Sequence, residues 1–343
     1  MKIWIFTDTH LGARSNNNEW IDIIESAHYD FIIPTIEKNW TKGDIIIHCG
    51  DVFDNRQSLN LKVLDLGIKI YERLAKLGEI HIIAGNHDIY KKDSTEITSL
   101  DILKYIPNIH IWKKPGCIER GNQKLFLMPW RANTKEESKT LIEFQDTYSP
   151  DYAFMHGTFS STQYNKYVKI GKDDGGSTTS TKGYKRVYSG HIHWAQMIKN
   201  INIVGSPYEI TRGDSDNKKG MYSLDLDSGE ETFYENTVSP KHIKFRKIEA
   251  VAPNNFIDIV IANSALASTA SKFKKALDKV KALARNLEIQ QYEDTVEEEQ
   301  EVDENATLDH DELIQSEIEK RLPDADDRAS AIKIIDDIIK EVT

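Results

Sequence analysis

Short apolar runs alternate with amphipathic segments along the first two thirds of the chain. Turn residues bound eight such runs, at residues 3–6, 44–48, 80–84, 110–112, 124–128, 152–155, 186–188 and 201–204. Most are continuous, which is typical of strands buried on both faces. Apolar residues at helical spacing occupy the early gaps, from Trp20 to Phe31 and from Leu61 to Leu74. The pattern predicts an α/β domain with mixed, partly antiparallel sheets flanked by helices.

The pattern changes near Ser239 and Pro240, so we place the end of the first domain at residue 238. Strands are predicted over 242–251, 256–261 and 287–292, with one helix over 264–285, giving a small α+β domain over 239–292. Residues 293–312 form a predicted flexible acidic linker. Residues 313–343 carry apolar positions at helical spacing, interrupted by Pro323, and predict a C-terminal helical tail. Residues 171–183 have no apolar periodicity and predict a surface loop.

The net charge of −11 comes from one segment. Residues 293–312 contain eleven acidic residues and no Lys or Arg, so the rest of the chain is close to neutral. The acidic balance therefore does not exclude a nucleic-acid substrate, and no basic footprint points to one.

Nothing in the sequence predicts a membrane or secretory segment. No apolar run reaches the roughly 18 residues of a membrane-spanning helix. The N-terminal apolar stretch turns polar after six residues, which is too short for a secretory signal. The two cysteines, Cys49 and Cys117, have no metal-ligand spacing and predict reduced thiols. We expect a cytoplasmic protein, in the host cell if it is phage-encoded.

Polar side chains follow five of the predicted strands at the point where each ends. In open α/β sheets, ligands bind beyond the carboxyl ends of the strands. The residues that this rule brings together are Asp8, His10, Asp51, Asn86, His87, His156, His191 and His193. On an extended chain, the i, i+2 spacing of Asp8 and His10, and of His191 and His193, would put each pair on one side.

This set of side chains has the chemistry of a metal site. Carboxylates, an amide oxygen and imidazoles suit Mn, Fe or Zn better than Mg or Ca. Four ligands close a structural zinc site, so seven ligands and a spare histidine fit two ions that share a carboxylate. Two-metal sites clamp the attacking and leaving oxygens in phosphoryl displacement. Among the other histidines, His48 and His81 are predicted to be core or interface residues, and His28, His110, His242 and His310 surface residues.

The order D-x-H, GD-x-x-D, GNHD, H and GHIH over residues 1–207 resembles the calcineurin-like metallophosphoesterase superfamily. The spacing, the length and the acidic and helical tail are similar to its double-strand-break repair nuclease branch. That branch includes the bacterial SbcD subunit and the nuclease subunit of the T-even phage recombination complex. The resemblance implies the layered metallophosphoesterase sandwich for residues 1–238 and a DNA-binding capping role for residues 239–292.

The resemblance also implies a role for each motif residue. Asp8, His10 and His193 would hold one metal ion, and Asn86, His156 and His191 the other, with Asp51 bridging them. His87 would be the catalytic histidine that protonates the leaving oxygen, and Asp88 would orient it. Several family members carry a histidine where this chain has Asp54, which departs from that pattern and is a candidate catalytic residue in contact with substrate or metal-bound water.

The function implied by the resemblance is Mn-dependent 3′–5′ exonuclease and structure-specific endonuclease activity in a recombination or repair complex. Mg, Fe or Zn are alternative ions. Double-stranded DNA ends would be the substrate, a coiled-coil ATPase subunit would bind the C-terminal helices, and the nuclease would be a homodimer. Another metallophosphoesterase activity, as a phosphatase or cyclic-nucleotide phosphodiesterase, and a non-catalytic scaffold remain alternatives.

Basic residues near the motifs and on the predicted helix 264–285 are candidate DNA contacts. They are Arg56, Lys91, Lys92, Arg212, Lys272, Lys275 and Lys279. Phosphate neutralisation by Lys and Arg dominates nucleic-acid affinity. A solvated helix face is the alternative explanation for the lysines on the helix.

Overall fold

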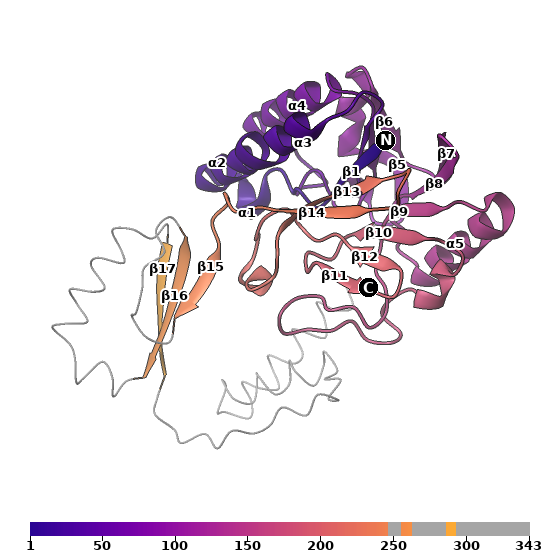
Figure 1. The fold of residues 1–343 in the computed structure, drawn as a ribbon. Coiled ribbons are helices and arrows are strands. Elements are labelled where there is room, and N and C mark those ends of the chain that lie inside the picture. The colour runs from indigo at the N-terminus through magenta and orange to yellow at the C-terminus, as the bar shows by residue number, and fades with distance from the viewer. Residues whose placement is uncertain (246–254, 263–285, 293–343) are drawn as a thin grey trace. The chain divides into compact units, whose positions relative to one another are not determined.

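The structure, a computed structural model, describes residues 1–245, 255–262 and 286–292 (Figure 1). Its first six-stranded sheet has the order β14 (Glu231–Glu235), β13 (Gly220–Asp225), β1 (Lys2–Phe6), β2 (Ile45–His48), β3 (Ile80–Ile83) and β6 (Ile109–Trp112). Strands β1, β2, β3 and β6 are parallel, and β13 and β14 extend the sheet in antiparallel pairing.

The second six-stranded sheet contains the later strands. Its order is β11 (Gln196–Ile198), β12 (Ile201–Ile203), β10 (Arg186–Gly190), β9 (Tyr152–His156), β8 (Gln123–Met128) and β7 (Gly116–Arg120). The inner strands are parallel and both edge strands are antiparallel. A short hairpin, β4 (Ile89–Lys91) and β5 (Ser94–Thr98), follows β3.

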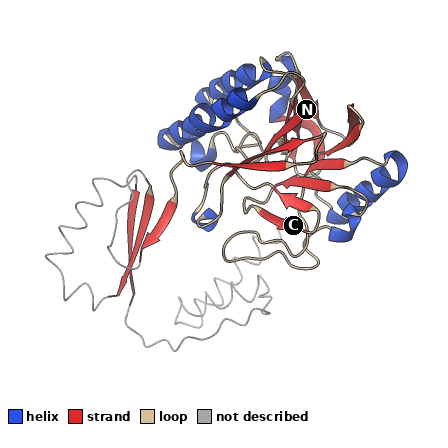
Figure 2. Cartoon of the chain, in the orientation of Figure 1, coloured by secondary structure: helices blue, strands red, loops and turns tan. Residues whose placement is uncertain are grey.

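The two sheets pack face to face, with helices on their outer faces (Figures 1 and 2). Ile3 and Ile47 of the first sheet share a buried cluster with Phe154 of the second. The outer face of the first sheet packs against α2 (Asn18–Ser26), the π-helical turn η1 (Ala27–Ile32), α3 (Ile33–Asn39) and α4 (Leu61–Ala75). Helix α5 (Thr134–Tyr148) covers the second sheet through Leu141. The predicted layered α/β sandwich is confirmed.

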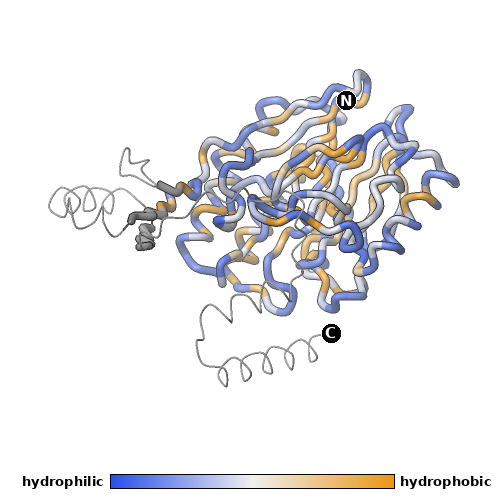
Figure 3. The backbone as a smooth tube through the Cα atoms, turned by 90° about the horizontal axis from the view of Figure 1, so that it is seen from below, coloured by the Kyte–Doolittle hydropathy of each residue, from blue (hydrophilic) through white to orange (hydrophobic). Residues whose placement is uncertain are grey.

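Burial on both faces explains the continuous apolar runs. All four residues of β2 and of β3 are buried. Hydrophobic stretches lie in the interior strands, and hydrophilic stretches lie mainly in the peripheral loops (Figure 3). The sequence pattern did not predict α5, because only Glu137 and Leu141 of this helix are buried. Its start is instead marked by Asn133, whose side chain accepts hydrogen bonds from the backbone N–H groups of residues 135 and 136.

A separate three-stranded parallel sheet follows residue 241. It consists of β15 (His242–Phe245), β16 (Phe256–Ala262) and β17 (Asn286–Tyr292), in that order. Strands β16 and β17 match the predicted segments 256–261 and 287–292 except for one extra residue each, Ala262 and Asn286. Strand β15 covers the start of the predicted strand 242–251, whose remainder lies outside the described residues. The predicted helix 264–285, the acidic linker and the helical tail lie outside the described residues, and the domain boundaries stay predictions. No helix of the described segments is long and apolar enough to cross a membrane.

The predicted surface loop 171–183 is partly wrong. It contains the 3-10 turn η3 (Thr178–Thr181), and Ser180 and Thr181 are buried. The hydroxyl of Thr181 donates to the backbone oxygen of Thr178 and to the side chain of Asn200. A polar segment can therefore be buried because its hydroxyl groups find partners.

The predictions for the remaining histidines are confirmed for His48, His81 and His110 but are wrong for His28. His48 and His81 are buried in their strands and His110 is exposed. His28 lies in η1 and is completely buried. Its Nδ1 donates to the carbonyl oxygen of Ile24 at 2.7 Å, whereas its Nε2 has no partner among the described residues. Burial lowers the pKa of His28 to about 4. His242 is half-buried and His310 lies outside the described residues.

We expect His28 to make the protein less stable in acid. His28 binds a proton near pH 6.5 in the unfolded chain and only near pH 4 in the folded chain. The free energy of unfolding should therefore fall by about 2 kcal/mol between pH 7.5 and pH 5 through this group. Urea unfolding of wild type and His28→Leu at both pH values measures the difference, because other groups titrate equally in both. An identical pH dependence of the two proteins would contradict the expectation.

Candidate metal centre

The five strand ends meet at one edge of the sandwich. The turns after β1 and β2 are joined by hydrogen bonds from the N–H of Asp8 to the oxygen of Gly50 and from the N–H of His10 to the oxygen of Asp51. The N–H of His191, after β10, donates to both carboxylate oxygens of Asp8 at 3.1 Å. Backbone contacts thus hold turns from both sheets around the same site.

Four of the candidate ligands have an uncommon backbone conformation. Asp8, His10, Asp51 and His191 have φ values of 52°, 38°, 57° and 84°. Positive φ is uncommon for residues other than glycine and is found where tertiary structure imposes it. The expectation that strand alternation aligns Asp8 with His10 and His191 with His193 is therefore wrong. Left-handed turns beyond the strand ends aim these side chains.

Close approach of the backbone requires glycine at one of these turns. Gly50 has φ +101°, and a Cβ atom there would lie 2.4 Å from Nδ1 of His156. A larger residue at position 50 would therefore displace His156 or strain the turn that carries Asp51.

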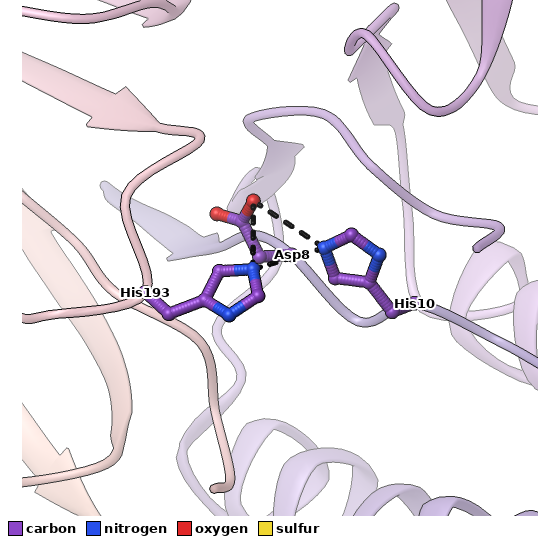
Figure 4. Close-up of side chains that lie close together, drawn as sticks. All are labelled: Asp8, His10 and His193. Atoms are coloured by element: carbon purple, nitrogen blue, oxygen red, sulfur yellow. Dashed lines mark hydrogen bonds and ion pairs between the residues drawn. The ribbon is translucent and has the colours of Figure 1, made fainter. Parts of the chain in front are cut away.

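The first cluster consists of Asp8, His10 and His193, which point toward one another (Figure 4). The Nε2 atoms of the two histidines are 3.1 Å apart. Asp8 Oδ1 lies 3.8 Å from Nε2 of His10 and 3.9 Å from Nε2 of His193. Two nitrogen ligands that bind one ion at about 2.0–2.1 Å lie roughly 3 Å apart, so this spacing fits a shared cation.

The second cluster consists of Asp51, His156 and His191, with Asn86 between the two imidazoles. Oδ1 of Asn86 lies 2.9 Å from Nε2 of His156 and 2.7 Å from Nδ1 of His191. Nδ1 of His156 donates to the carbonyl oxygen of Cys49 at 2.8 Å. Because a carbonyl oxygen only accepts, Nδ1 carries a hydrogen, and Nε2 of His156 is the nitrogen that would bind a metal ion in place of a proton.

Asp51 connects the two clusters. Its Oδ2 lies 3.6 Å from Nε2 of His10 and 3.3 Å from Nε2 of His156. Its Oδ1 accepts the backbone N–H of His87 at 2.8 Å. His10, Asp51 and His87 form a third group with ligand atoms within 4.8 Å of one another. One carboxylate oxygen therefore faces both halves of the centre.

The electrostatics of the centre also suit cations. Burial opposes ionisation of Asp8, but the nearby imidazole of His10 and the charge of His156 lower the pKa of Asp8 to about 2. Burial lowers the pKa of His156, but the charge of Asp51 outweighs it and raises the pKa to about 9. A metal ion would replace the protons on such histidines, so its affinity should fall in acid.

His87 and Asp54 lie at the edge of the first cluster. Nδ1 of His87 donates to the carbonyl oxygen of Asp54 at 2.7 Å. The carboxylate of Asp54 accepts from Nδ1 of His10 at 3.1 Å. The rings of His10 and His87 meet edge to face, with centroids 4.8 Å apart. Residue 54 thus orients two histidines, one through its backbone and one through its side chain.

Asp88 does not orient His87, contrary to the expectation. The buried Asp88 carboxylate accepts four backbone hydrogen bonds, from Asp51, Val52, Phe53 and Gly85, at 2.8–3.2 Å. Burial and the charge of Asp51 raise its pKa to about 7, while hydrogen bonds from Gly85 and Phe53 act in the opposite direction. Asp88 therefore holds the turn that carries Asp51.

Sequence reasoning missed a buried group behind His193. Asp214 Oδ2 lies 3.9 Å from Nδ1 of His193, and Lys219 donates to the carbonyl oxygen of His193 at 2.6 Å and to Asp214 at 3.3 Å. Burial opposes ionisation of Asp214, but the nearby imidazole of His193 and the charge of Lys219 hold its pKa far below the usual range. No strand end precedes Asp214, so the sequence carried no comparable signal.

Trp130 is a second residue that sequence reasoning missed. Its indole ring lies 4.6 Å from the ring of His191 and 5.9 Å from that of His156, centroid to centroid. Trp130 follows the buried strand β8 directly after Pro129. Its position after a buried strand was the same signal that identified the ligand candidates.

The candidate DNA contacts have different positions. Lys91 and Lys92 are exposed in the β4–β5 hairpin, and Arg212 is exposed at the start of the 3-10 turn η4 (Arg212–Asp214). Arg56 is half-buried, two residues after Asp54. Lys272, Lys275 and Lys279 lie outside the described residues.

The sequence of residues 1–196 matches the calcineurin-like phosphoesterase family. The chain belongs to this family. Calcineurin-like phosphoesterases bind divalent metal ions and hydrolyse phosphoesters, and the clustered carboxylates and imidazoles of this member fit such ions.

Two viral proteins are similar in sequence to this calcineurin-like phosphoesterase. Exonuclease subunit 1 of Enterobacteria phage T4 is 28% identical over 242 residues, which cover 70% of this chain and 69% of that protein. Putative phosphoesterase 078R of Invertebrate iridescent virus 3 is 27% identical over 207 residues, 55% of this chain and 56% of that protein. Among solved structures, an archaeal phosphodiesterase is 17% identical with a TM-score of 0.35, covering 69% of this chain and all of that one.

Proposed function

We propose that this phosphoesterase is the Mn-dependent nuclease subunit of a DNA recombination or repair complex. It would act as a 3′–5′ exonuclease and structure-specific endonuclease on double-stranded DNA. The observation that carries the proposal is the paired cluster around Asp51, which fits two cations sharing one carboxylate. Similarity to the phage exonuclease subunit supports DNA as the substrate.

In this proposal each donor group has a defined task. Asp8, His10 and His193 would hold one ion, Asn86, His156 and His191 would hold the other, and Asp51 would be shared between them. Bound ions of this kind make water a nucleophile at neutral pH and offset the charge that develops on the phosphate. Manganese suits the mixed oxygen and nitrogen donors, as would Fe or Zn, and Mg suits them less.

His87 is the proposed proton donor. Its Nδ1 donates a hydrogen bond to the carbonyl oxygen of Asp54, which fixes the orientation of the ring. Nε2 is not used in this hydrogen bond. A proton on Nε2 of the ring would pass to the sugar oxygen as the phosphorus–oxygen bond breaks. Asp88 contributes indirectly, because it holds the turn of Asp51.

A comparison of substrates tests this function. With Mn present, the protein should degrade end-labelled linear duplex DNA from its 3′ ends and hydrolyse p-nitrophenyl phosphate at least about 100-fold less efficiently. A phosphatase or cyclic-nucleotide phosphodiesterase would use the same groups but would hydrolyse only small substrates and not DNA. Hydrolysis of the phosphomonoester without DNA cleavage would refute the nuclease assignment, and failure to bind Mn at any pH would favour a non-catalytic scaffold.

We further propose that residues 313–343 bind a coiled-coil ATPase subunit, and that the nuclease is a homodimer. The apolar periodicity of this tail, after an acidic segment, supports a docking element. Deletion of residues 313–343 should abolish co-purification with the ATPase and leave Mn-dependent cleavage of linear DNA unchanged. Undiminished co-purification would place the docking site elsewhere in the chain.

A further inference from the structure

Trp130 is a half-buried residue beside the second metal cluster, and Arg131 follows it in the chain. The backbone N–H of Trp130 donates to the oxygen of Ala84 at 2.9 Å, just before the turn that carries Asn86 and His87. The indole ring lies beside His191 and His156 but is only half-buried, so part of it remains open to solvent. A ring placed only to pack against the histidines would not need this exposed part.

Arg131 has an unusual environment for a cation. Its Nε is removed from solvent and has no hydrogen-bond partner in the described part of the chain. Buried donors of this kind are uncommon, because desolvation without a partner costs free energy. The residue as a whole is half-buried, so part of it other than Nε is open to solvent. A guanidinium group pairs particularly well with phosphate oxygens.

On the basis of the proposed nuclease function, we infer that Trp130 and Arg131 bind the nucleotide next to the scissile phosphate. The base of that nucleotide stacks on the exposed part of the Trp130 ring. Arg131 donates to the adjoining phosphate of the same strand. Every base has an aromatic face, so stacking tolerates any sequence. This pair gives the centre a preference for nucleic-acid phosphodiesters over phosphate esters without a base or a second phosphate.

Substrates that lack one base test the stacking. Linear duplex DNA substrates, assayed with Mn, would each carry one abasic site at a different terminal nucleotide. At one of these positions the abasic site should raise the KM of the wild type about tenfold. Trp130→Leu should raise the KM for intact DNA by about the same factor and show no additional increase with that abasic substrate. Trp130→Phe should keep most of the affinity, because it keeps an aromatic ring.

The role of Arg131 has an independent test. A neutral methylphosphonate at the adjoining linkage should raise the KM of the wild type about tenfold. Arg131→Gln should raise the KM for unmodified DNA similarly and be insensitive to that substitution. The slope of log K for DNA binding against log salt concentration should also be shallower for Arg131→Gln, by the amount that about one lost phosphate contact contributes. If Trp130→Leu does not fold, Trp130→Met and the Arg131 series carry the test.

Matched controls separate stacking and phosphate binding from packing. Trp40 is also a half-buried tryptophan that packs on the core of the first sheet, and Trp40→Leu should leave KM unchanged. Arg73 pairs with Glu37 on the surface, and Arg73→Gln should likewise leave KM unchanged. Mn content should equal that of the wild type in every variant. Loss of Mn from Trp130→Leu would show that this ring only positions His191 and would overturn the inference.

The remaining outcomes distinguish the inference from the function on which it rests. In one outcome the wild type degrades DNA while, at every position, the KM increase caused by the enzyme substitution multiplies with the KM increase caused by the substrate modification. In that case the inference is wrong and the nuclease function stands. If the wild type hydrolyses p-nitrophenyl phosphate but cleaves none of the DNA substrates, both are wrong.

Discussion

His87→Ala is expected to lower the rate of DNA cleavage by about 10²–10⁴-fold while both Mn ions stay bound. General acid catalysis by a positioned side chain contributes an effect of that size. The three donor groups Asp8–His10–His193, Asn86–His156–His191 and Asp51 are complete without His87. Nδ1 of His87 donates to the carbonyl oxygen of Asp54, and the ring meets the His10 ring edge to face. We expect both clusters to keep their ligands when the ring is removed, because none of the proposed ligands is lost.

Two measurements on the purified variant decide this prediction. Metal analysis should find the same Mn content as in the wild type, and single-turnover cleavage of labelled duplex DNA should report the lost rate. His110→Ala, which removes an exposed histidine of β6, is the matched control and should be normal in both assays. Loss of one ion in His87→Ala would mean that His87 is a ligand with His10 and Asp51, as their proximity also permits.

Asp51→Asn is expected to remove Mn from the centre and with it at least roughly 10³-fold of the cleavage rate. The ions supply several kcal/mol of transition-state stabilisation, and their loss converts to a factor of that order. Oδ2 of Asp51 faces one histidine of each cluster, so loss of its charge weakens both halves. Asparagine keeps the shape of the residue and can still accept the N–H of His87 through Oδ1.

A titration with Mn measures this effect. The variant should bind fewer ions at low Mn concentration and regain part of its activity as the concentration rises. Asp65→Asn is the matched control, because Asp65 is an exposed residue of α4 that pairs with Lys69. Normal Mn affinity of Asp51→Asn would exclude a shared carboxylate at this position.

The two substitutions differ in what they are expected to separate. His87→Ala should uncouple chemistry from metal binding, whereas Asp51→Asn should remove both together. A protein in which both variants lost metal equally would have a centre built differently from the one proposed. The comparison therefore tests the division of the clustered side chains into ligands and a proton donor, which proximity alone does not establish.

Much of the fold could be predicted from the sequence because its strands are buried on both faces. Such strands leave continuous apolar runs, as in residues 45–48 and 80–83. Helix α4 was equally readable from its apolar stripe, which includes Leu66, Ile70 and Leu74. Helix α5 was not, because it covers the second sheet with few buried side chains. The division of the strands between two sheets depends on long-range pairing that local patterns do not carry.

The sequence by itself determined the kinds of donor groups and their positions after the strand ends. Only the tertiary structure decided how they are aimed, because left-handed turns at Asp8, His10, Asp51 and His191 are imposed by contacts between distant segments. Contacts between distant segments also place the Asp88 carboxylate where it accepts backbone hydrogen bonds from the Asp51 turn, and they place Trp130 beside His191. A side chain's partners depend on which chain segments meet, and a linear pattern does not contain that information.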